Sequence, residues 1–244
     1  MTHHEKRTMV GMSELQAVFW DMDGTLVDTE PYWIESQHEL VEAHGGTWSD
    51  EKAHLLVGQA LDFSAKILQE SGVRMGTEEI ITHLIGEVIA KCSAEIPWRP
   101  GARELLSDLH AQGVRNALVT MSWKPLAEAI VSALPDGQME FIVSGDMVSA
   151  GKPDPEAYNL AFDTMSQDHR ERTGEDLVRE RCVAIEDSVP GTAAAAASGM
   201  VTLAVPHYTP LPENGQWHLL QTLQGLGTED LTQLLSKTPA GAAV

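Results

Sequence analysis

The stretch AVFWDMDGTLVDT, residues 17–29, runs from a short apolar segment into two aspartates, a glycine and a threonine. The apolar run 17–20 is typical of a buried strand, and Asp21 and Asp23 follow it directly. Open α/β sheets bind their ligands in the crevice at the carboxyl ends of the strands. A bare pair of aspartates is more often a solvated loop, but the strand and the glycine favour a site. In such a site one carboxylate attacks the substrate while the other moves protons.

The composition is strongly acidic. The 244 residues include 36 acidic and 16 basic side chains, which gives a formal net charge of −20, and 43% of the residues are hydrophobic. That hydrophobic share is ample for a core. The charge repels nucleic acid and anionic membranes, and no basic patch offsets it. A protein of this charge that acts on phosphates needs local neutralisation, which a divalent cation and a placed lysine would supply.

Three further features favour a cytoplasmic protein without a membrane partner. The sequence has no apolar run of about eighteen residues, and its start lacks the apolar segment of a signal peptide. Cys92 and Cys182 each lie in an apolar pattern, which predicts buried thiols in a reducing compartment. Residues 1–13 are interpreted as a flexible N-terminal lead.

Apolar spacing divides the chain into a helical segment and an alternating one. Residues 31–97 carry apolar side chains at helical spacing, and Thr77 is a candidate cap for the longest of these helices. After this segment, short β-rich runs alternate with helical patterns, which is typical of a parallel sheet. The densely charged stretch 166–181 is expected to be a solvated helix face or a loop. Core strands are expected at 116–120, 141–146, 182–187 and 201–205, and core helices at 125–134, 155–165 and 191–198.

The first stretch is similar to the first motif of the haloacid dehalogenase superfamily of phosphotransferases, D-x-D-G-T-x-x-D. The matching residues are Asp21, Asp23, Gly24, Thr25 and Asp28. The resemblance implies that Asp21 is a nucleophile that takes up the phosphoryl group as an aspartyl phosphate. It implies that Asp23 protonates the leaving oxygen and then activates water. This division is physically sound, because a carboxylate that attacks phosphorus needs its charge screened and a leaving alkoxide needs a proton.

Three further motifs of that superfamily follow in order, each at the end of a predicted strand. The resemblance implies that the Thr120 hydroxyl binds a phosphate oxygen and that Lys152, in GKPDPEAY, neutralises the nucleophile and the phosphoryl oxygens. It implies that Glu186 and Asp187 hold Mg²⁺. The predicted catalytic residues are Asp21, Asp23, Thr120 and Lys152; the predicted substrate-binding residues are Gly24, Gln59, Thr120, Met121 and Lys152; and the predicted metal ligands are Asp21, Asp23, Glu186 and Asp187.

The resemblance covers nearly the whole chain and implies a fold. The class is α/β: a Rossmann-like parallel sheet core, residues 14–30 plus 98–244, with an inserted all-helical cap domain at 31–97. The partner is a small phosphorylated metabolite, and the oligomeric state is left open. Further positions expected to line the cleft are Trp33, Gly58, Gln59 and Trp123.

The presence of Asp23 points to phosphate esters, because dehalogenases and phosphonatases of the superfamily lack this aspartate. Within the helical-cap branch the sequence resembles β-phosphoglucomutase and the small-metabolite phosphatases beside it. Where the mutase has a cap histidine and a cap arginine, this chain has Trp33 and Leu61. Leu61 offers no charge to a second phosphate, and Trp33 is expected not to hydrogen-bond Asp23 as an imidazole would.

The sequence therefore predicts a Mg²⁺-dependent phosphatase that hydrolyses a small phosphomonoester, a sugar or polyol phosphate, through an aspartyl phosphate. The first alternative is a β-phosphoglucomutase-type phosphomutase, distinguished by whether inorganic phosphate is released. A second, non-enzymatic alternative is a phosphorylation-switched signalling module, because receiver domains also group acidic residues, a Thr or Ser and a Lys around Mg²⁺. The D-x-D spacing, the helical insert and the length count against this second alternative.

Overall fold

The computed structural model of the protein describes residues 15–56, 59–213 and 215–239. The predicted N-terminal lead, 1–13, and Gly58 lie outside these ranges. Among the described residues, no helix is both long and apolar enough to cross a bilayer.

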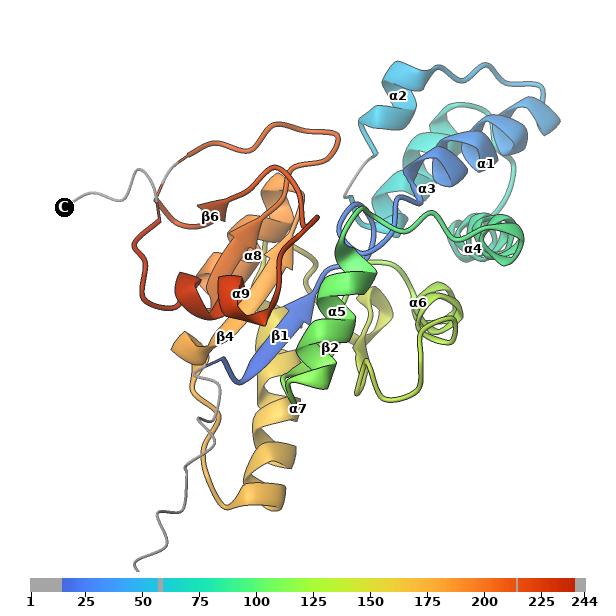
Figure 1. The fold of residues 1–244 in the computed structure, drawn as a ribbon. Coiled ribbons are helices and arrows are strands. Elements are labelled where there is room, and N and C mark those ends of the chain that lie inside the picture. The colour runs from blue at the N-terminus through green and yellow to red at the C-terminus, as the bar shows by residue number, and fades with distance from the viewer. Residues whose placement is uncertain (1–14, 57–58, 214, 240–244) are drawn as a thin grey trace, which may run out of the picture.

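A parallel sheet forms the centre of the described structure (Figure 1). Its strand order is β3-β2-β1-β4-β5-β6. Strand β1 lies between β2 and β4, and its register pairs Trp20 with Leu118 on one side and with Ile185 on the other. The carboxyl ends of these three strands therefore meet at one edge. The strands are β1 (Ala17–Trp20), β2 (Arg115–Val119), β3 (Ile142–Val143), β4 (Cys182–Glu186), β5 (Val201–Ala204) and β6 (His218–Leu219).

Helices cover both faces of the sheet, because successive side chains of a strand point to opposite faces. Val18 and Trp20 of β1 belong to an apolar cluster with α5 (Ala102–Ala111), α6 (Lys124–Val131) and α9 (Thr228–Leu234). Ala17 and Phe19 belong to a second cluster with α7 (Glu156–Thr173) and α8 (Val189–Ala197). All four β1 residues are buried. The alternation makes β1 the shared centre of both layers.

Within the described residues five helices lie between β1 and β2, and the first four of them form the cap. Figure 1 shows them as a group beside the sheet, and α4 packs against α6 of the core. The first begins one residue before the predicted cap boundary. The cap helices are α1 (Glu30–Ala43), α2 (Asp50–His54), α3 (Leu61–Glu70) and α4 (Thr77–Ala94).

Some predicted element ends differ from the structure. Helix α7 continues to Thr173, well past the predicted end at residue 165, and stops at Gly174, whose backbone is left-handed. Charged side chains of this extension remain solvent-exposed and also form ion pairs, such as that of Asp168 with Arg115 at the start of β2. The helix-face alternative for the charged stretch therefore holds for its first half. The candidate cap at Thr77 is wrong: Gly76 is the N-cap, and its backbone N–H donates to the Glu79 carboxylate at 3.3 Å.

Candidate active site

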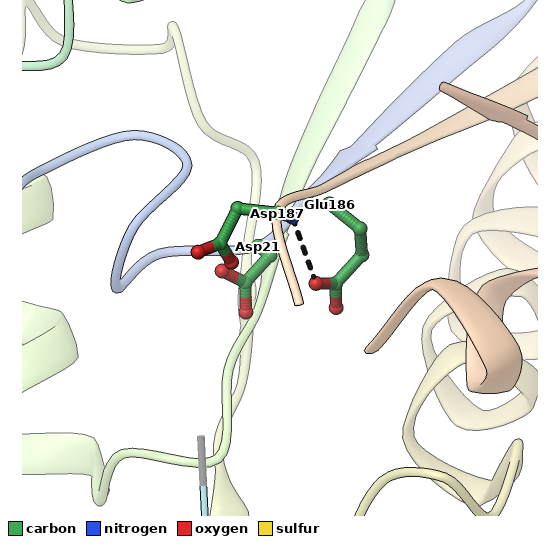
Figure 2. A group of neighbouring side chains, drawn as sticks. All are labelled: Asp21, Glu186 and Asp187. Carbon is green, nitrogen blue, oxygen red and sulfur yellow. Dashed lines mark hydrogen bonds between the residues drawn. The ribbon is translucent and has the colours of Figure 1, made fainter. Parts of the chain in front are cut away.

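The carboxyl end of the sheet carries a group of buried carboxylates from two adjacent strands. Asp21 follows β1, and its backbone N–H donates to the Ile185 carbonyl at 3.0 Å, which continues the pairing with β4. Glu186 and Asp187 come from the end of β4 and the residue after it. One carboxylate oxygen from each of the three residues lies within 4.8 Å of the others. Figure 2 shows the carboxylates of Asp21 and Asp187 side by side, while that of Glu186 points away from them.

A tight turn leaves room for the Asp187 carboxylate. After Asp21 the chain folds back, and the Gly24 N–H donates to the Val27 carbonyl at 2.7 Å. Gly24 has a φ of +92°, and a Cβ built on it would lie 2.1 Å from Oδ2 of Asp187. Glycine is therefore required twice here, once for the left-handed backbone and once for the space.

Lys152 is the cation of this group. Its side chain is only 4% exposed, and its Nζ donates to Oδ1 of Asp21 at 2.7 Å and to Oε1 of Glu186 at 2.6 Å. A third bond, at 2.9 Å, goes to the Val119 carbonyl at the end of β2. The lysine therefore binds the ends of three neighbouring strands and holds the nucleophile candidate in a fixed orientation.

Both carboxylate oxygens of Glu186 accept hydrogen bonds from the protein. Oε1 accepts from Lys152 and, at 2.8 Å, from the hydroxyl of Tyr158. Oε2 accepts from the backbone N–H of Asp187 at 3.2 Å and from the Ser188 hydroxyl at 3.4 Å. A cation at this site would therefore meet Asp21 and Asp187 first, with Glu186 acting mainly as the anchor of Lys152.

The site holds more negative than positive charge. Burial, and then the charge of Glu186, raises the pKa of Asp21 to about 7, although Lys152 opposes the shift. Burial and the charge of Asp21 likewise raise the pKa of Asp187 well above its usual range. Burial alone would lower the pKa of Lys152, but Asp21 and Glu186 outweigh it and raise that pKa. Three buried carboxylates facing one ammonium form a hard-oxygen donor set, which fits a divalent cation such as Mg²⁺ or Ca²⁺.

Asp23 lies outside the group of three carboxylates and is held by hydroxyls. Its Oδ1 accepts from Thr29, and its Oδ2 accepts from Ser122 at 2.7 Å and from Thr120 at 3.3 Å. The indole N–H of Trp33 approaches Oδ1 at 3.5 Å, a long hydrogen bond. The expectation that Trp33 makes no hydrogen bond to Asp23 is therefore wrong, because α1 brings the indole over the carboxylate.

A cleft between core and cap opens onto these side chains. The predicted residues Gln59 and Met121 lie in its wall, and so does Leu61. Trp123 does not line the cleft; it precedes α6 and packs against the apolar core. The residues that line the cleft are Asp21, Asp23, Gly24, Glu30, Trp33, Gln37, Leu56, Gln59, Leu61, Ser64, Thr120, Met121, Ser122, Lys152, Asp187, Ser188 and Tyr208.

Several cleft residues were not predicted from the sequence. Ser122 could have been found, because it follows Thr120 by two residues at the same strand end. Gln37 lies on α1 one turn beyond Trp33, a spacing that places both on one helix face. Tyr208, from the segment after β5, donates its hydroxyl to Oδ1 of Asp28 at 2.9 Å. No local pattern connects residues this far apart in the chain.

Comparison with known families identifies the chain. The family model for haloacid dehalogenase-like hydrolases matches residues 15–199. The chain belongs to this family of hydrolases, as the resemblance of its motifs implied.

Individual relatives agree with this assignment. A phosphorylated carbohydrates phosphatase of Thermotoga maritima is 28% identical over 189 residues, 76% of this chain and 82% of that protein. Among solved structures, CbbY of Rhodobacter sphaeroides in complex with xylulose 1,5-bisphosphate is similar with a TM-score of 0.75 and 26% identity, covering 87% of this chain and 97% of that chain. A β-phosphoglucomutase of Clostridium difficile, with a TM-score of 0.71 and 19% identity over 91% of this chain and 97% of that chain, shows the same fold. The predicted fold class is confirmed, and the prediction of a phosphatase of this family agrees with these matches.

We expect Gly24→Ala to cost more than the same change at Gly45. Both glycines have left-handed backbones, with φ of +92° and +77°, but a Cβ at Gly45 would meet nothing within 4 Å. Gly45→Ala should therefore lose about 1 kcal/mol of stability from backbone strain alone and keep its activity. Gly24→Ala should also displace Asp187 and lower kcat/KM about 100-fold. Thermal melts and hydrolysis rates of the two variants would check this, and equal activities would contradict the role given to Asp187.

We expect ionisation of Asp21 to lower the stability of the metal-free protein. The pKa of Asp21 is about 7 in the folded state and 3.8 by itself, so the folded state holds this proton more tightly. The group's stabilising contribution is present below pH 4 and is lost as pH rises through 7. In EDTA, Asp21→Asn should therefore melt higher than the unsubstituted protein at pH 8, with a smaller difference at pH 5. Melting curves across this pH range would measure the difference in melting temperature. A difference that does not grow with pH would contradict the raised pKa of Asp21.

Proposed function

We propose that this hydrolase is a Mg²⁺-dependent phosphatase that acts on a small phosphomonoester, a sugar or polyol phosphate, through an aspartyl phosphate on Asp21. The observation that carries the proposal is the placement of Asp21 at the base of the cleft, with the Lys152 ammonium 2.7 Å from its Oδ1. The name of the Thermotoga maritima relative, a phosphatase of phosphorylated carbohydrates, supports this substrate class.

Asp21 and Asp187 are the residues that would hold the Mg²⁺. Their carboxylates lie side by side and have fewer protein donors than Glu186, since Asp187 accepts only a long 3.5 Å bond from Thr25 among the described residues. When bound, the cation would offset the charge of the carboxylates and of the phosphoryl oxygens. The other two ligands predicted from the sequence, Asp23 and Glu186, contribute through the hydrogen bonds described above.

The chemistry has two steps. In the first, a carboxylate oxygen of Asp21 attacks phosphorus, the bond from phosphorus to the ester oxygen breaks, and Asp23 gives that oxygen a proton. Lys152 and the Thr120 hydroxyl stabilise the charge on the transferred phosphoryl group. In the second, Asp23 takes a proton from water, which attacks the aspartyl phosphate and releases inorganic phosphate and free Asp21.

The lining of the cleft favours water over a second sugar hydroxyl as the acceptor. A mutase must bind a bisphosphate in either orientation, which requires a cation at the far end of the cleft. Among the described residues that line it, Lys152 is the only one with a positive charge, and it lies beside Asp21 and Glu186 at the reacting end. Leu61 occupies the wall where the resemblance placed the mutase arginine. The phosphomutase alternative is therefore disfavoured, and the same lining favours a substrate with one phosphate.

The test of the proposal follows both products of a hexose phosphate by phosphorus NMR. We expect inorganic phosphate to accumulate without isomerised sugar phosphate, because the described residues that line the cleft place no cation where a second phosphate would lie. The reaction should stop in EDTA and resume with Mg²⁺. Isomerised sugar phosphate with little free phosphate would establish a mutase instead, and full activity in EDTA would remove the metal from the mechanism.

A second prediction tests the role of Asp23. Asp23→Asn keeps the acceptor oxygen for Ser122 and Thr120 but cannot transfer a proton. An aryl phosphate has a good leaving group and needs less proton donation than an alkyl phosphate. The loss of activity should therefore be larger for the alkyl ester, by about 10-fold or more. Rates with matched alkyl and aryl phosphates would show it, and equal losses would contradict the acid role.

A further inference from the structure

The cap side of the cleft contains a buried amide whose oxygen accepts no hydrogen bond from the described residues. Gln37 of α1 is 4% exposed and lines the cleft. Its Oε1 is fully buried and, within the described part of the chain, accepts no hydrogen bond. An amide withdrawn from water without a partner is unfavourable. A leucine would fill such a position at less cost if packing were its only purpose.

The position of Gln37 connects it to the reaction. Gln37 lies one helical turn after Trp33, whose indole N–H reaches Asp23, so the two side chains share one face of α1. The leaving oxygen of a bound ester must lie near Asp23. A leaving group that extended past Trp33 along this face would meet Gln37, and Gln59 and Ser64 of the cap line the same cleft.

We infer that Gln37 is a specificity-determining residue that hydrogen-bonds a hydroxyl group on the leaving part of the substrate. This inference rests on the proposed phosphatase function and adds to it the recognition of a neutral polyol. A carboxamide both donates and accepts, which matches an alcohol, and the hydroxyl would supply the donor that Oε1 lacks. A site built in this way discriminates against analogues without the hydroxyl, because binding them leaves the amide unpaired.

The experiment compares Gln37→Met, which keeps the size of the side chain but not its hydrogen bonds, with the unsubstituted enzyme. The substrates are sugar monophosphates, the matched deoxy compounds that each lack one hydroxyl, and p-nitrophenyl phosphate as a reference without hydroxyls. The unsubstituted enzyme should prefer one hydroxylated compound over its deoxy partner by about 10-fold or more in kcat/KM. Gln37→Met should bring this ratio close to one, and its loss should be larger for the sugar phosphate than for the aryl phosphate.

Ser36→Ala is the matched control. Ser36 is the neighbour of Gln37, is also buried, and its hydroxyl has no hydrogen-bond partner in the described part of the chain, but it does not line the cleft. Its substitution should leave the hydroxyl preference unchanged. Gln37→Leu provides a second shape in case Gln37→Met melts markedly lower, and it should lose the preference in the same way.

Three results would overturn the inference. Equal losses for sugar and aryl phosphates in both Gln37 variants would mean a packing role. Hydrolysis of sugar phosphates by the unsubstituted enzyme without any hydroxyl preference would overturn the inference while the phosphatase proposal stands. No phosphate release from any ester would overturn both proposals.

Discussion

The ammonium of Lys152 joins the ends of β1, β2 and β4 at a single atom. Its three hydrogen bonds go to Asp21, to the Val119 carbonyl and to Glu186. A buried charge is stable only when it is paired and its donors are satisfied, and here every donor of the ammonium has a partner. Because the partners come from neighbouring parallel strands, the sheet register decides whether this site can form.

The same arrangement gives a physical reason why the site would attract both a cation and a phosphate. One ammonium does not balance three buried carboxylates, and burial together with the neighbouring negative charge raises the pKa of Asp21 to about 7. The carboxylates left without enough donors are those of Asp21 and Asp187, since that of Glu186 accepts hydrogen bonds from Tyr158 and Lys152. A bound divalent cation would remove the excess and leave a positive field at the entrance to the cleft. An acidic protein can in this way bind an anionic substrate without any basic surface.

Much of the core of the site could be predicted from the sequence, because Asp21 and Asp187 directly follow adjacent parallel strands, which end at one edge. Lys152 lies in the segment between β3 and α7, and its side chain reaches the same edge. Residues that reach the site through the packing of cap on core have no such local signal. Gln37 is indistinguishable in sequence from an ordinary polar helix position. Trp33 was not expected to hydrogen-bond Asp23, because it replaces the mutase histidine. The sequence does not show where an indole N–H will point, and in the structure it points to Asp23.

The position at which α1 begins links proton transfer by Asp23 to substrate specificity. The helix begins directly after Thr29, whose hydroxyl binds the same Asp23 oxygen that the Trp33 indole approaches. One face of α1 therefore contacts Asp23 at its first turn and would contact the leaving group of a bound ester one turn later. A rotation or shift of α1 that changed the contact of Gln37 with a substrate would also change the hydrogen bonds of Asp23. Substrate preference in this protein is therefore expected to change through side-chain replacement on α1, because movement of the helix would impair the proton transfer.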